Sequence, residues 1–194
     1  VRSRGLGDVY KRQGSWASTL SLFRINQPTA IVNASNYYVI DGLTRSQGIE
    51  WNVFGRVAPR LNVMGGLMIL NAEYERTQGG LKDGNQVFGT PQFNATLALD
   101  WETKAKGLNI YGRMHYFGTS YADSLNRIEV PAWTRVDLGA QYKTEAFGCP
   151  ATLNFMVYNV FNKMYWSTTT VKWSENGLML NPGRTYMLSA TISL

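Results

Sequence analysis

Residues 92–102, QFNATLALDWE, decide the fold class, because their side chains alternate between apolar and polar. The apolar positions are Phe93, Ala95, Leu97, Leu99 and Trp101. The polar positions are Gln92, Asn94, Thr96, Asp100 and Glu102. A period of two places the two sets on opposite faces of a β-strand, whereas the period of a helix lies near 3.6 residues. The stretch therefore predicts a strand with one apolar and one polar face.

The same alternation recurs on both sides of this stretch. It is as regular over residues 133–143 and 185–194, and weaker over residues 15–25, 44–56, 61–73, 108–117 and 151–162. These segments predict about eight strands. An aromatic content of 13% and 19 glycines suit pleated strands and turns better than helices. We expect an all-β fold.

The connections between these strands alternate in length. Long ones cover residues 26–43, 77–90, 121–131 and 163–183, and short ones cover 57–60, 103–107 and 145–150. Membrane β-barrels place short turns at the periplasmic end and longer loops outside the cell. Aromatic residues near the strand ends suit two interfacial girdles: Trp101 and Tyr142 near short turns, Tyr116 and Trp133 near long loops. The pattern predicts an antiparallel transmembrane β-barrel.

The predicted polar face is too charged for a closed barrel of this size. An interior of about eight strands is just wide enough for side chains to fill it. The inward-facing positions include Glu50, Asp100, Glu102, Arg113, His115, Arg135, Asp137 and Gln141. We therefore expect an open arc of a larger barrel, with antiparallel pairing between successive strands. No stretch of about 18 uncharged apolar residues suggests a membrane-spanning helix.

Charge and residue counts argue against several other functions. Half of the net charge of +6 lies in the first 13 residues, and the remaining basic residues are scattered singly, so we expect no nucleic-acid binding. A single cysteine, Cys149, and a single histidine, His115, leave no internal disulfide and no Cys/His metal site. Ser120 and Asp123 near His115 make a poor catalytic set. We expect no enzyme activity and no metal held by the chain.

The opening run of residues 1–13, VRSRGLGDVYKRQ, differs in character from the rest of the chain. It resembles translated adaptor sequence, and it has no apolar core like that of a secretory signal. A natural flexible arm is the alternative interpretation. We expect it to stand outside the fold, so that the strand beginning at Ser15 lacks an upstream partner.

Five stretches, in order along the chain, resemble TonB-dependent siderophore receptors. They are SQGIEWNVFGRVAPRLNVMGG (46–66), VFGTPQFNATLALDWE (87–102), GLNIYGRMHYFGTSYADSLNRIEVPAWTRVDLGAQY (107–142), NFMVYNVFNKMYWST (154–168) and NPGRTYMLSATISL (181–194). The fourth is the most specific, through its spacing of Asn159, Asn162, Lys163 and Tyr165. Trp133 departs from the usual tyrosine, Pro182 and Gly183 stand in swapped order, and Leu194 replaces a terminal aromatic residue.

This resemblance implies that residues 14–194 are the C-terminal part of a receptor barrel of about 22 strands, with the plug domain and TonB box upstream of this sequence. It implies active uptake of ferric siderophores across the outer membrane of a Gram-negative cell. The implied partners are the siderophore, outer-membrane lipid and, through the missing N-terminal region, the TonB complex. Iron would arrive only as the siderophore chelate, without a cofactor bound by the chain. A passive porin-type channel and a soluble all-β binding domain are the alternatives, and cobalamin and glycan receptors stay open within the family.

Candidate site residues fall into two groups. Aromatic side chains in the long connections are candidates for stacking on a flat iron chelate, or for simple loop packing: Tyr37, Tyr38, Tyr121, Trp166 and Trp173. His115 is a candidate ligand contact or a wetted residue of the wall. Arg113, Arg135 and Asp137 are candidates for plug-facing contacts in the lumen, or for pairing among themselves. Asn159 and Asn162 are interpreted as polar ends of a strand that enters a loop.

Overall fold

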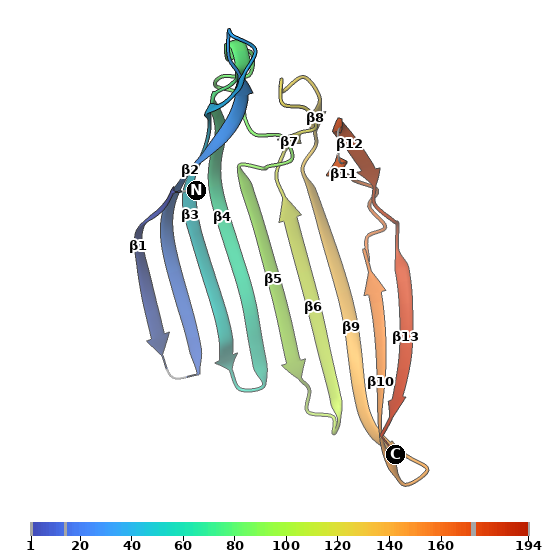
Figure 1. Ribbon diagram of the computed structural model, residues 1–194. Coiled ribbons are helices and arrows are strands. Elements are labelled where there is room, and N and C mark those ends of the chain that lie inside the picture. The colour runs from blue at the N-terminus through green and yellow to red at the C-terminus, as the bar shows by residue number, and fades with distance from the viewer. Residues whose placement is uncertain (1, 14, 172–173, 194) are drawn as a thin grey trace.

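The computed structural model describes residues 2–13, 15–171 and 174–193, and it shows one broad sheet with loops gathered at one end (Figure 1). Nine antiparallel strands form the sheet in the order β1-β2-β3-β4-β5-β6-β9-β10-β13. They are β1 Arg2–Gln13, β2 Trp16–Val32, β3 Tyr38–Ala58, β4 Leu61–Arg76, β5 Phe93–Glu102, β6 Leu108–Phe117, β9 Trp133–Ala146, β10 Cys149–Tyr158 and β13 Thr185–Ile192. The loops contain η1 Gln78–Gly80 and two small hairpins, β7 Ser120–Tyr121 with β8 Glu129–Val130 and β11 Trp166–Val171 with β12 Ser174–Leu180.

The all-β prediction is confirmed, and each of the expected strands is present. Neighbours in the sheet follow chain order and pair antiparallel, with the two loop hairpins set aside as separate small sheets. The sheet is unclosed: within the described residues β1 and β13 lie at opposite edges and do not pair with each other (Figure 1). An open arc is therefore what the chain forms.

The expectation for the opening residues is wrong in one respect. Strand β1 pairs with β2 from Arg2 opposite Asn26 to Gln13 opposite Trp16, with a register shift between Gly5 and Gly7. The predicted strand from Ser15 therefore has an upstream partner. The physical reason is that a ladder is made by backbone groups, which any extended, proline-free segment can supply to a free edge. The interpretation of residues 1–13 as adaptor-like sequence stays a prediction.

The connection predicted over residues 26–43 is mostly strand. Residues 27–32 of β2 pair with 38–44 of β3, so the two strands continue past the end of β4 and turn only at 33–37. The β-branched and aromatic residues of this segment favour extended backbone. Figure 1 shows this hairpin and the other long connections at one end of the sheet, and the short turns at the other. The segregation of long and short connections is confirmed.

The register separates the two faces as the alternation predicts, since directly opposed residues share a face. Leu97 faces Met114, which faces Val136, and Phe155 faces both Ala140 and Leu188. Through this register one face carries Phe93, Leu97, Leu138, Leu188 and Ile192, and the other carries Asn94, Asp100, Arg135, Asp137 and Thr191. We call them the apolar face and the polar face.

The girdle prediction holds only in part. Trp101 and Tyr142 lie on the apolar face near short turns, and Tyr116 lies on it near the long loops. Trp133 instead shares the polar face with Phe117, its directly opposed neighbour. The reason is parity: residue 133 falls on the same side of β9 as Arg135 and Asp137.

A single-layer sheet buries few of its large apolar side chains. Leu22, Ile49, Trp51, Leu99, Trp101, Leu138 and Phe155 are all exposed, and all belong to the apolar face. An apolar surface of this extent in water is a marker of a membrane or protein contact. Among the described residues, no helix is long and apolar enough to cross a membrane.

Candidate ligand-binding wall and loops

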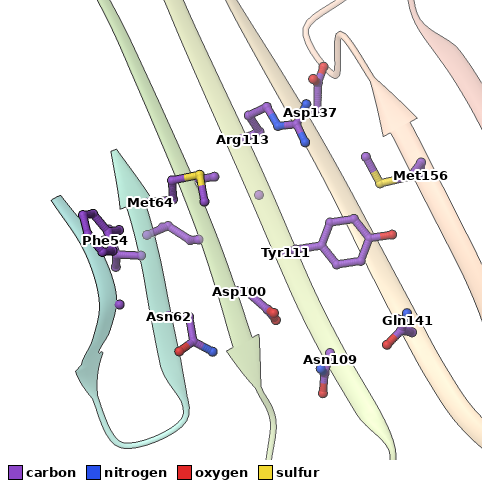
Figure 2. Close-up of a pocket in the computed structure, with 15 residues that line it drawn as sticks. Phe54, Asn62, Met64, Asp100, Asn109, Tyr111, Arg113, Asp137, Gln141 and Met156 are labelled. Carbon is purple, nitrogen blue, oxygen red and sulfur yellow. The ribbon is translucent and has the colours of Figure 1, made fainter. Parts of the chain in front are cut away.

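A shallow trough runs along the polar face at mid-height. Figure 2 shows its lower part, a cavity of about 550 Å³ with Phe54, Met64, Tyr111 and Met156 as its larger apolar side chains. An adjoining hollow of about 530 Å³ reaches up to Glu50, Thr96 and His115, and shares Met64, Ala98 and Arg113 with the first. Met64 and Met68 also lie on this face, opposite Ala98 and Asn94 of β5. The wall is thus a mixed apolar and polar surface of low relief.

Glycine at position 139 keeps the trough open. A Cβ atom added at Gly139 would lie 2.3 Å from Met156 Sδ and 2.3 Å from Tyr111 Cε2. Both side chains therefore lie flat across β9, in the space that a side chain at 139 would need. Gly66 acts similarly under Asn52, whose Nδ2 donates a hydrogen bond of 2.8 Å to Glu50 Oε1.

Asp137, which lines the lower cavity of the trough, is the centre of a buried polar network. Its side chain is 1% exposed. One carboxylate oxygen accepts a hydrogen bond from Arg135 Nη2 at 3.0 Å, and the other accepts from the backbone N–H of Asn159 at 2.9 Å. Burial of a carboxylate is costly unless it is paired and hydrogen-bonded, and here both oxygens are engaged.

An aromatic column stands next to this network. The Trp133 ring stacks between Phe117, at 5.4 Å between centroids, and Tyr165, at 4.2 Å. Tyr165 is buried, and Arg135 Nη1 lies 3.5 Å from its hydroxyl. The column spans β6, β9 and the connection that follows β10, and so fastens that connection to the polar face.

Two of the loops are joined into one unit, which we call the loop pair, residues 77–92 and 118–131. Asn126 Nδ2 donates to Gln86 O at 2.8 Å, and its Oδ1 accepts from Gln86 N–H at 2.7 Å. Gly89 N–H donates to Tyr121 O at 2.7 Å. Ser120, Ala122, Asp123, Ser124 and Val130 are all buried in this unit. The loop pair is therefore packed like a small core.

Asp123 holds the second of these loops in shape. Its Oδ1 accepts hydrogen bonds from the backbone N–H groups of Ile128 at 2.9 Å and Arg127 at 2.8 Å, and the Arg127 guanidinium lies 3.0 Å from Oδ2. Burial acts to raise the pKa of Asp123, but these donors outweigh it, so the pKa lies below its ordinary value. The carboxylate is thus held ionised.

The predicted aromatic contacts lie on three separate connections. Tyr37 and Tyr38 stand at the tip of the β2–β3 hairpin and are 70% and 84% exposed. Tyr121 lies in β7, half-buried in the loop pair, and Trp166 begins β11 and is exposed. Trp173 lies outside the described residues. The structure does not bring the four described side chains into one cluster.

The predicted wall residues do come together. His115 faces Arg135, and Arg113 faces Asp137, across β6 and β9. The pairing of Arg135 with Asp137 was anticipated as the alternative to a plug contact. Arg113 is the exposed member of the three charged residues. His115 Nδ1 lies 3.2 Å from Thr96 Oγ1.

Several residues that organise this region were not predicted as site residues. Asn126 and Tyr165 act through contacts with segments far along the chain, and Asp123 acts through backbone groups of its own loop. Periodicity reveals neither kind of contact. Asn159 was interpreted only as the polar end of a strand. Within the described residues no group of three His, Cys, Asp or Glu side chains is placed to hold a metal ion.

Comparison with known proteins identifies the family. The family model described as "TonB dependent receptor-like, beta-barrel" matches residues 6–160. The ferrichrome receptor FcuA of Yersinia enterocolitica is 26% identical over 181 residues, which are 92% of this chain and 23% of that protein. The ferrioxamine receptor of the same species is 28% identical over 181 residues, 87% of this chain and 25% of that protein.

Solved structures agree. BauA, the ferric preacinetobactin receptor of Acinetobacter baumannii, is 32% identical with a TM-score of 0.87, over 95% of this chain and 28% of its own. The ferric citrate transporter FecA, at 18% identity, shares the fold with a TM-score of 0.78, over 96% of this chain and 30% of its own.

The chain spans about a quarter of the length of the curated relatives named here. Its matches are transport receptors rather than enzymes. The unclosed two-faced sheet superimposes on part of the BauA structure over 95% of this chain. The chain belongs to the TonB-dependent receptor family and forms part of that family's β-barrel.

Proposed function

We propose that this chain forms part of the wall and outer loops of a Gram-negative outer-membrane receptor that imports ferric siderophores with energy supplied through TonB. The observation that carries the proposal is the sheet itself, with an exposed apolar face for lipid, a polar face and long connections at one end. The relatives with matching sequence are receptors for ferrichrome, ferrioxamine and ferric preacinetobactin. Iron would be cargo inside the siderophore chelate, so the protein would need no metal ligands or cofactor of its own.

Ligand contact is proposed for the exposed aromatic residues of the loops. Tyr37 and Tyr38 are the strongest candidates, because Asn33 fixes the backbone of the turn next to them: Asn33 Oδ1 accepts from Ser35 N–H and Tyr37 N–H, each at 3.0 Å. A loop whose backbone is ordered before binding loses less entropy when it binds, and a tyrosine side chain has few rotatable bonds to fix. Trp166 and Tyr121 are the further candidates among the described residues, with His115 on the wall below them.

The trough on the polar face is proposed as the surface against which the receptor's plug domain rests. Arg113 is the best placed of the predicted contacts, since it is exposed and lines both hollows. Arg135 is partly exposed and bound to Asp137, whereas Asp137 has both oxygens occupied within the wall. A plug contact is therefore proposed chiefly for Arg113.

Uptake measured in cells tests this function. The full-length receptor that contains this chain would be expressed in a Gram-negative strain that lacks its own siderophore receptors. We expect uptake of radioactive iron from at least one of ferrichrome, ferrioxamine and ferric preacinetobactin, and loss of that uptake when TonB is deleted. Uptake that persists without TonB would contradict the proposal and favour a passive channel.

Substitution of Tyr37 and Tyr38 by alanine should weaken ligand binding.

A further inference from the structure

The most specific motif of the chain builds a tight turn directly after β10. Asn159 and Asn162 have positive φ angles of 53° and 51°, a region in which Asn is favoured among residues that carry a side chain. Asn162 N–H donates to Asn159 O at 2.8 Å, which closes the turn. The two asparagines therefore shape the backbone here and do not simply end a strand.

This turn is bound to the wall at its first residue. Asn159 is 2% exposed, and its backbone N–H donates to the buried carboxylate of Asp137 on β9. The next residue, Val160, donates its N–H to Val136 O at 2.8 Å. The backbone contact between β9 and β10 thus continues to Val160, two residues beyond the end of β10, and the Asp137 carboxylate accepts from the N–H of the residue in between, Asn159.

The same turn holds both ends of the β11–β12 hairpin. Asn159 Oδ1 accepts from Lys163 N–H at 3.0 Å, and Asn159 Nδ2 donates to Lys163 O at 2.8 Å and to Pro182 O at 3.3 Å. Lys163 precedes the hairpin and Pro182 follows it. Asn162 Oδ1 adds a hydrogen bond from Arg184 N–H at 2.8 Å. One buried side chain therefore ties the entering and leaving segments together.

We propose that Asp137 and Asn159 are positioning residues, which fix the direction in which the β11–β12 hairpin leaves the wall. A two-stranded hairpin has little stability by itself, so its placement depends on its attachment. Tyr165, stacked on Trp133, supports the attachment from the side of β11. The hairpin lies near β8 of the loop pair at the loop end of the sheet (Figure 1). A role of the hairpin in ligand capture, through Trp166 of β11, rests on the proposed function. The placement of the hairpin does not, because it can be measured without ligand.

Distance measurement by pulsed electron spin resonance tests the proposal in the full-length receptor that contains this chain. Spin labels would be attached at Ile128→Cys in the loop pair and Met179→Cys on β12, in a Cys149→Ser background. Asp137→Ala removes the acceptor for Asn159 N–H, and Asn159→Gly removes the side chain while it tolerates the positive φ angle. Asp137→Asn keeps an oxygen for that N–H. Asn154→Ala is the matched control, since it breaks a hydrogen bond with Gln141 on the same two strands, away from the turn.

We expect one narrow distance distribution in the parent receptor, in Asp137→Asn and in Asn154→Ala. Asp137→Ala and Asn159→Gly should broaden the distribution or add a second distance. Narrow distributions in every variant would overturn the proposal, and so would equal broadening in Asn154→Ala. If Asp137→Ala does not assemble in the membrane, Asn159→Gly decides the outcome. A negative result in this experiment would not bear on siderophore uptake, since no ligand is added.

Discussion

Gly139 is the residue on which the relief of the polar wall depends. Strand residues on this face normally project from it, yet Tyr111 and Met156 lie flat because position 139 has no side chain. The alternation along β9 predicted which face residue 139 occupies. It did not predict the need for glycine there, because that need arises from side chains on β6 and β10 that are neighbours only in the folded sheet.

Gly139→Ala should destabilise the receptor by about 1–3 kcal/mol, the usual cost of overpacking a filled position. The new methyl group would meet Met156 Sδ and the Tyr111 ring at 2.3 Å. Gly65→Ala is the matched control, since its nearest neighbours would lie at an ordinary 3.4 Å. Urea unfolding in detergent, followed by tryptophan fluorescence, measures both. Equal stability of the two variants would refute this account of the trough.

Asp123 should make the loop pair sensitive to acid. Its folded pKa lies below the ordinary value, so its stabilising contribution is complete above the unfolded pKa of about 3.9 and is lost as the pH falls through the folded value. Hydrogen exchange of residues 122–128 should be flat between neutral pH and mild acid, after correction for intrinsic rates, and rise below that window. Asp123→Asn keeps an acceptor oxygen for the backbone donors but should abolish the rise in hydrogen exchange at low pH, because the amide does not titrate. A rise of the same size in that variant would count against the carboxylate.

At the scale of elements, strands and loops differ in how far the sequence predicts them. Apolar and polar residues alternate along a strand that has one apolar and one polar face, so β5, β9 and β13 were predicted from local residues alone. The loop pair depends on Asn126 and Gln86, which are 40 residues apart and joined through side-chain and backbone groups. Strand β1 was missed for the opposite reason, because a backbone ladder requires no side-chain pattern.

Loss of Asn126 should loosen both loops of the pair together. Asn126→Gly suits the positive φ of 54° but removes both hydrogen bonds with Gln86. The half-buried backbone groups of Gln86 lose these partners, at a cost of about 1 kcal/mol. Hydrogen exchange should become faster in residues 77–92 as well as in 118–131. Asn36→Gly, at another positive-φ asparagine in the β2–β3 turn, is the control and should leave both loops unchanged. Faster exchange confined to 118–131 would show that the loops are independent.

At the scale of the whole molecule, the sheet has faces and edges that need a partner. The apolar face needs lipid or protein to cover it, and each edge strand has backbone groups that could pair with a further strand. The apolar face of the sheet exposes large side chains, and over the residues that the structure describes β1 and β13 do not pair with each other. The alternation, the loop lengths and the charge of the polar face together predicted this incompleteness, because each is a property of the chain itself. The position of the β11–β12 hairpin was not predictable in the same way, since it depends on the buried contacts of Asp137 and Asn159.

Single-cysteine labelling of the full-length receptor in intact outer membranes tests the central claim, that the apolar face meets lipid and the polar face meets the lumen. Cysteines would replace Leu97, Leu138 or Leu188 on the apolar face, and Thr96, Asp100 or Arg113 on the polar face, in a Cys149→Ser background. We expect the first set to react with a lipid-soluble maleimide and to resist a charged one. The second set should react with the charged reagent once the receptor is extracted and its lumen opened by mild denaturant. Labelling of Leu97, Leu138 and Leu188 positions by the charged reagent in intact membranes would contradict the account.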